Sequence, residues 1–145
     1  ANKTRHVIVD NTPPKIGVPS IDPADPGEGE SVTVSVKVFD AISGVAEVIL
    51  SYSIDGVVWK GIVMTEVGGV YKATIPGQSV GTRVLYEIHA RDNAGNWAVS
   101  NQYSYVVYIM GVKAAHMLVV YLIGGVIGMV VTITIIKRLL RRRAS

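Results

Sequence analysis

Acidic and amide side chains occur in three separate turn-like segments of this chain of 145 residues. Asp10 precedes Asn-Thr-Pro-Pro, Asp40 begins Asp-Ala-Ile-Ser-Gly, and Asp92 and Asn96 belong to Asp-Asn-Ala-Gly-Asn. If the intervening segments pair as antiparallel strands, the three turns meet at one pole of the fold. Oxygen ligands from three loops suit Ca²⁺, which takes about six to eight of them. The alternative is ordinary turn chemistry, in which Asp, Asn and Gly shape loops without a metal.

Groups that could perform catalysis are sparse. The three histidines, His6, His89 and His116, are far apart, and the chain has no cysteine. Neither a Ser-His-Asp arrangement nor a glycine-rich phosphate loop is present in the sequence. We therefore expect no enzyme activity and no cofactor other than the candidate calcium ion. Charged residues that share a strand face with His89 predict cross-strand ion pairs.

Period-two alternation of apolar and polar residues predicts that most of the chain forms strands. The segment 31–39 places a valine at every second position, and 83–91 alternates in the same way. About seven strands follow one another at intervals of roughly ten residues, with Gly, Pro, Asn and Asp between them, which is typical of a β-sandwich. The expected strands are 15–21, 31–39, 45–54, 57–64, 70–75, 83–91 and 97–108, with Ala46, Val48, Leu50 and Tyr52 facing inward in the third.

Several of these segments resemble known modules. The segments 55–59, 71–76 and 81–96, with the pattern Tyr86-x-Ile88-x-Ala90-x-Asp92, are similar to fibronectin type III-like and bacterial Ig-like modules of prokaryotic surface proteins. The resemblance covers residues 12–108 and implies an antiparallel Ig/fibronectin III-like β-sandwich in an extracellular protein. The style of the module further implies a prokaryotic, archaeal source. The run from Asp10 to Pro14 resembles the junction between tandem modules, so residues 1–11 are expected to be the end of a preceding module or a linker.

The twenty residues from Met117 to Ile136 carry no charge. A helix rises about 1.5 Å per residue, so this run covers the ~30 Å core of a bilayer. We predict a single transmembrane helix over residues 113–138. A buried core helix is the alternative, but it would show a polar face. The five bases that follow the run are Lys137, Arg138, Arg141, Arg142 and Arg143, and they place the tail, 139–145, in the cytoplasm by the positive-inside rule.

The charge distribution limits the partners. The formal net charge of +3 comes from the five bases that follow the apolar run, because the remaining nine bases are outnumbered by eleven acids. No basic face is left for nucleic acid, and the expected partner is the lipid bilayer.

Gly124 and Gly128 form a small-xxx-small pair that would let two helices associate, although glycine is also simply common in spanning helices. Asn2-Lys3-Thr4 is a glycosylation sequon.

The first ten residues contain no apolar signal region. Either a signal peptide has been removed, or this is the C-terminal piece of a longer polypeptide whose upstream modules are partners.

These observations leave three functional hypotheses. The first is a non-catalytic, membrane-proximal module and anchor of a cell-surface protein of the S-layer, adhesion or stalk type. The second is an exterior module that binds a glycan or a protein, and the third is the C-terminal tether of an upstream surface enzyme. An anchor needs no exposed aromatic or apolar patch, whereas a binding module does. The burial of Trp59 and Trp97 therefore distinguishes the first two hypotheses.

Overall fold

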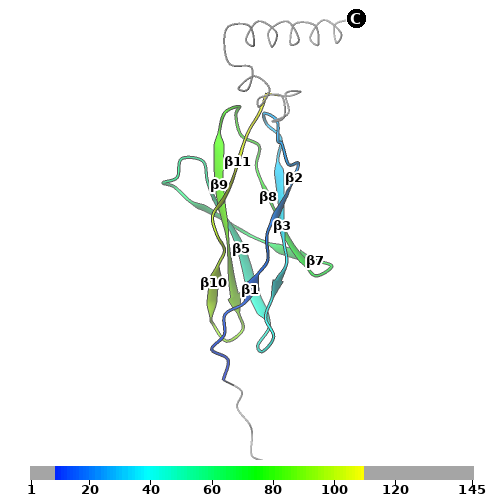
Figure 1. The fold of residues 1–145 in the computed structure, drawn as a ribbon, viewed down its shortest axis with the longest axis vertical. Coiled ribbons are helices and arrows are strands. Elements are labelled where there is room, and N and C mark those ends of the chain that lie inside the picture. The colour runs from blue at the N-terminus through cyan, green and yellow to red at the C-terminus, as the bar shows by residue number, and fades with distance from the viewer. Residues whose placement is uncertain (1–8, 110–145) are drawn as a thin grey trace, which may run out of the picture.

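The computed structural model describes residues 9–109, which form an elongated body of two antiparallel sheets (Figure 1). The predictions for Asn2, for the transmembrane helix 113–138 with Met117, Gly124, Gly128 and Ile136, and for Lys137, Arg138, Arg141 and the tail 139–145 lie outside the described residues. Within residues 9–109 the structure is mainly β, as predicted, and contains no helix.

The larger sheet has five strands and is built around its longest one, β9. β9 pairs with β5 on one side and with two shorter strands, β10 and β11, on the other. β6 pairs with the far edge of β5. The strands are β5 (Val45–Ser53), β6 (Lys60–Val63), β9 (Arg83–Asp92), β10 (Trp97–Val99) and β11 (Tyr103–Val106).

The smaller sheet has four strands in the order β2-β3-β8-β7, and β1 and β4 form a separate two-stranded ribbon that contacts β10 and β5 of the larger sheet. The four strands are β2 (Ser20–Asp22), β3 (Val32–Val36), β7 (Thr65–Val67) and β8 (Val70–Ile75), and the ribbon consists of β1 (Lys15–Ile16) and β4 (Val38–Phe39). A two-residue turn joins β7 to β8. Its residues, Gly68 and Gly69, both have positive φ, which matches the twist of a tight hairpin.

The core lies between the two sheets and is made of the alternating residues predicted from the sequence. β3 and β4 contribute four buried valines, and β9 contributes Val84, Tyr86, Ile88 and Ala90, each at most 4% exposed. Leu50 of β5 and Ile75 of β8 are fully buried. Because alternate side chains of a strand point to opposite faces, the outward residues of β9, such as His89, are partly exposed.

The prediction that Ala46 faces inward is wrong. Opposite β9, Val45 pairs with Asp92 and Glu47 pairs with Arg91, so Ala46 is an extra residue in a β-bulge. The bulge resets the alternation, because two residues on one strand oppose one on the other. Val45 therefore packs against the core, Ala46 is exposed, and Val48 is buried.

Several predicted strands are interrupted, which is why eleven short strands replace about seven. The residues 57–59 form a loop instead of a strand, because Asp55 Oδ1 accepts the backbone N–H groups of Val57 and Val58, each at 2.8 Å. The segment 97–108 is broken at Ser100, whose hydroxyl oxygen accepts the N–H of Ile88 at 2.9 Å. In both places a side chain replaces a strand carbonyl as the acceptor, so the regular ladder stops.

The chain enters and leaves the sandwich at opposite poles (Figure 1). At the N-terminal pole, the carbonyl of Asp10 accepts a hydrogen bond from Asn96, which follows the end of β9. At the C-terminal pole, the N–H of Val107 donates to Thr82, just before β9 begins. The ten residues of β9 separate the two poles, which corresponds to about 30 Å at ~3.3 Å per residue.

Candidate functional site

The N-terminal pole gathers three acidic residues from three segments. Asp10 lies in the segment that leads into the sandwich, Asp40 lies in the loop between β4 and β5, and Asp92 is the last residue of β9. The structure brings one carboxylate oxygen of each within 4.8 Å of the others. Figure 1 shows the three segments at the same end of the body. We call Asp10, Asp40 and Asp92 the acidic cluster.

Asp10 and Asp40 are each held by hydrogen bonds within their own turns. Asp10 Oδ1 accepts the backbone N–H of Thr12 at 2.9 Å and its hydroxyl at 2.6 Å. Asp40 Oδ1 accepts the N–H groups of Ser43 and Gly44, both at 2.8 Å. Aspartate side chains commonly organise turns in this way. In each residue one carboxylate oxygen is therefore used within the turn, and the described residues form no hydrogen bond to the second, Oδ2.

Asp92 is fully buried and is held by the turn that follows it. Its two oxygens accept the backbone N–H and the side-chain Nδ2 of Asn96, each at 2.8 Å. The same Nδ2 donates to the backbone carbonyl of Asp10 at 3.1 Å. The side chain of Asn93 donates to the carbonyls of Ser43 and Gly44 and connects this turn to the Asp40 loop. The three segments are thus tied together by amide donors.

The cluster carries negative charge at neutral pH. The hydrogen bonds from Thr12 lower the pKa of Asp10, and the polar groups of the nearby Ser43 act in the same direction. Burial alone would raise the pKa of Asp92, and the charge of Asp10 acts in the same direction, but the hydrogen bonds from Asn96 and Gly95 outweigh both and lower it. Among residues 9–109, no Lys, Arg or His nitrogen lies within 4.0 Å of the three carboxylates; the ion pairs there join Glu47 to Arg91 and Glu87 to His89.

The sequence analysis named all four residues of the candidate calcium set. The structure places Asp10, Asp40 and Asp92 together and places Asn96 beside them. Asn96 turns its amide nitrogen toward Asp92, so in this arrangement it positions the carboxylates. The ion pair Glu47–Arg91 joins β5 to β9 across the strand face of His89, at 3.6 Å, as predicted for that face.

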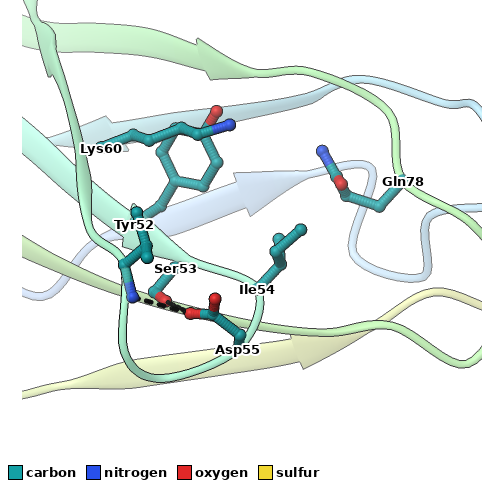
Figure 2. A pocket seen from close by; sticks show the side chains of 7 residues that line it. Tyr52, Ser53, Ile54, Asp55, Lys60 and Gln78 are labelled. Atoms are coloured by element: carbon teal, nitrogen blue, oxygen red, sulfur yellow. Dashed lines mark hydrogen bonds between the residues drawn. The ribbon is translucent and has the colours of Figure 1, made fainter.

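The C-terminal pole carries a pocket that the sequence analysis did not identify. It has a volume of about 250 Å³ and is lined by Tyr52, Ser53, Ile54, Asp55, Val58, Lys60 and Gln78. Figure 2 shows Gln78 across the pocket from Tyr52 and Lys60. Asp55 accepts hydrogen bonds from Ser53 and from the backbone of the following turn, which lower its pKa. The pocket arises because this turn and the loop after β8 meet at the same pole, which no local signal reveals.

Neither tryptophan is buried in the core. Trp97 on the edge strand β10 is 49% exposed, and the guanidinium carbon of Arg91 lies 5.7 Å from the centroid of its ring. Trp59, in the loop before β6, is partly exposed. Phe39, Val57 and Val58 are also exposed. Burial of both tryptophans would have removed the best candidates for a binding surface, so their exposure keeps the binding hypothesis alongside the anchor.

Within residues 9–109 we find no helix of the length and apolarity needed to cross a bilayer.

Comparison with known proteins gives structural neighbours only. No protein-family model matches the chain, and no curated protein matches it. Among solved structures, it is similar to BhCBM56, a carbohydrate-binding module solved as a bromine derivative, with 16% identity and a TM-score of 0.47 over 61% of this chain and 88% of that chain. It is also similar to the beta-1,2-glucanase from Parabacteroides distasonis, with 20% identity and a TM-score of 0.43 over 69% of this chain. That match spans 14% of the glucanase, and at these scores neither neighbour informs the function.

Proposed function

We propose that this chain is a non-catalytic exterior module and membrane anchor of a cell-surface protein, with an Ig/fibronectin III-like sandwich outside the membrane and a basic C-terminus in the cytoplasm. The observation that supports it most directly is the position of the two ends of the sandwich. A chain that enters at one pole and leaves at the other, about 30 Å away, holds whatever precedes it at a distance from whatever follows it.

The segment that follows the sandwich supports the membrane part of the proposal. The apolar run 117–136 begins a few residues after the C-terminal pole, and five bases follow the run. Hydrophobic insertion of such a run is effectively irreversible, and the bases interact with anionic headgroups. The module would then be the part of the protein next to the bilayer. An upstream surface enzyme would be tethered in the same way.

Vesicle flotation tests the anchor. The full chain, synthesised in the presence of liposomes and EDTA, is expected to float with them and to resist alkaline extraction. Replacing Val126 and Ile127 together by Asp places two charges at the centre of the run and costs about 5–7 kcal/mol of insertion free energy. We expect the floated fraction to fall at least about tenfold. The matched control replaces Val57 and Val58 by Asp at an exposed loop of the sandwich and should float like the parent.

The absence of cysteine provides a test of orientation. Ser79→Cys, at an exposed site of the sandwich, is expected to react with a membrane-impermeant maleimide on intact cells. Ser145→Cys is expected to react only after lysis. A full chain that stays unbound, or an Asp pair in the run that floats like the parent, would rule out the anchor, and reversed labelling would rule out the orientation.

A second candidate function, exterior recognition of a glycan or protein, is favoured by the exposed ring of Trp97. An aromatic ring at a sheet edge offers a large contact area at low cost in conformational entropy. In a screen of neutral oligosaccharides against the full chain in detergent, Trp97→Ala should weaken any binding at least about tenfold, or ~1.4 kcal/mol. Phe39→Ala, an exposed aromatic on the ribbon strand β4, is the control. Equal binding by both variants, or none by the parent, would argue against a glycan ligand at Trp97.

A further inference from the structure

We propose that the acidic cluster at the N-terminal pole is a Ca²⁺ site that clamps the incoming polypeptide onto the sandwich. Asp10, Asp40 and Asp92 each offer a carboxylate oxygen within 4.8 Å of the other two. That spacing allows all three oxygens to reach one ion, because Ca²⁺ binds oxygen ligands at about 2.3–2.6 Å and two ligands on opposite sides of it are therefore about 5 Å apart.

The unpaired oxygen of Asp10 is the independent sign of a ligand. Asp10 is 9% exposed, and its Oδ2 is buried without any hydrogen-bond donor among the described residues. Buried polar atoms are nearly always paired, because an unpaired one loses its hydration without compensation. Oδ1 of the same carboxylate is fully used by Thr12. A cation bound by Oδ2 would supply the missing partner.

The charge of the cluster points the same way. Three carboxylates converge, and the described residues provide no cationic side chain within 4.0 Å of them. Like charges at this separation repel, and the repulsion is larger in a partly buried setting than in water. A divalent cation bound between the three carboxylates would replace their mutual repulsion by attraction to the ion.

The chemical type of the ligand atoms indicates which metal ion the site would bind. All three side chains offer oxygen, and the chain has no cysteine, so hard cations are preferred over zinc or copper. The donors come from three separate segments of the chain and leave most of the coordination shell to water and backbone oxygens. Such an irregular shell suits Ca²⁺, whose geometry is flexible, better than Mg²⁺, which demands a near-ideal octahedron.

The consequence is mechanical. Asp40 and Asp92 belong to the body of the sandwich, whereas Asp10 belongs to the segment that leads into it. Among the described contacts, Asn96 Nδ2 to the Asp10 carbonyl is one direct link between that segment and the body. A shared ion would add a stronger link and fix the angle at which the preceding polypeptide meets the module.

Thermal unfolding of the full chain in non-ionic detergent, followed by tryptophan fluorescence, tests the site. Both tryptophans lie in the sandwich, so the signal reports its unfolding. If 1 mM CaCl₂ is about a hundred times the dissociation constant, Tm should rise by on the order of 10 °C relative to EDTA. MgCl₂ at the same concentration should give less than half of that shift.

The deciding variant is Asp10→Asn, which keeps an Oδ1 acceptor for Thr12 but removes one charge. It should abolish the calcium shift while leaving Tm in EDTA equal to or above that of the parent, because the repulsion is relieved. Asp55→Asn is the matched control: Asp55 also holds a turn through Oδ1, but at the opposite pole. It should keep the full shift.

The site is refuted if calcium leaves the Tm of the parent unchanged, or if Asp10→Asn retains the shift. A purely structural role of Asp10 would lower Tm equally with and without calcium, which also refutes it. Should Asp10→Asn fail to fold, Asp40→Asn decides by the same criteria. Because flotation is performed in EDTA, loss of the calcium site and loss of the membrane anchor are separate results.

Discussion

Replacing Leu50 by Ala is expected to lower the free energy of unfolding of the sandwich by about 2–5 kcal/mol. Leu50 has no exposed surface and lies in the middle of β5, opposite Ile88 of β9 and Ile62 of β6. The lost side chain removes apolar burial and also leaves a cavity, because strands held on both sides cannot close around it. Denaturant unfolding of the full chain in detergent, followed by tryptophan fluorescence, measures the change.

The matched control is Leu85→Ala. Leu85 is on the neighbouring strand β9, but its side chain points to the outer face of the sheet and is partly exposed. The same chemical change should cost less there, since part of the side chain already contacts solvent and solvent can fill the space that it leaves. Equal losses at the two positions would contradict the assignment of the inner and outer faces of this sheet.

The second large effect is expected at alkaline pH, where the sandwich should lose about 2–3 kcal/mol of stability between pH 10 and about 12. Burial raises the pKa of Tyr105 to about 12, and the nearby hydroxyls of Tyr86 and Tyr52 add to the effect. The unfolded chain ionises this tyrosine near pH 10, whereas the folded chain keeps it neutral. Stability is therefore complete below pH 10 and falls as the pH rises toward the folded pKa.

The cause lies in a cluster of tyrosines beside β9. The ring of Tyr86 stacks on Tyr103 at 5.5 Å and is tilted against Tyr105 at 6.3 Å, measured between ring centroids. Burial also raises the pKa of Tyr86. Tyr105→Phe removes one titrating group from this cluster and should reduce the alkaline loss. The remainder is due to Tyr86 and Tyr71, because burial raises the pKa of both.

The free energy of unfolding, measured from neutral pH to pH 12 with tyrosinate absorbance in parallel, checks this prediction. Tyr108→Phe, which removes a partly exposed tyrosine hydroxyl at the end of the last segment, serves as the control. A parent whose stability is flat over this range, or a Tyr105→Phe variant that loses as much as the parent, would show that Tyr105 does not titrate in the way its burial implies.

Much of the fold was predictable because its signals are local. In β3 and β9 the alternation of valine and other apolar residues with polar ones repeats every two positions, and the inner face follows directly from it. Turn residues were equally informative, as Gly68 and Gly69 show. The interruptions were not predictable. They depend on which acceptor a backbone N–H finds. Asp55 captures N–H groups two and three residues ahead in place of a strand partner, and Ser100 captures the N–H of Ile88 on the neighbouring strand β9.

The candidate functional residues likewise include a group that the sequence predicted and a group that it did not. Asp10, Asp40, Asp92 and Asn96 were predictable as a group, because turns that follow alternate antiparallel strands meet at one pole. The pocket around Lys60 and Gln78 was not, because its residues have no shared spacing and meet only through the arrangement of the two sheets. The predictions for Met117 to Ile136, for the basic tail and for Asn2 remain predictions from the sequence.

By itself, the sequence determined which residues are apolar, at what period, and where the chain can turn, and from these followed the strands, the inner faces and the expectation of a membrane segment. Only the tertiary structure decided that one oxygen of Asp10 is buried without a donor, that Ala46 is an extra residue, and that Trp97 lies exposed on an edge strand. The physical reason is range: periodicity and turn chemistry act between neighbours, whereas burial, register and unpaired atoms depend on contacts between segments far apart in the chain.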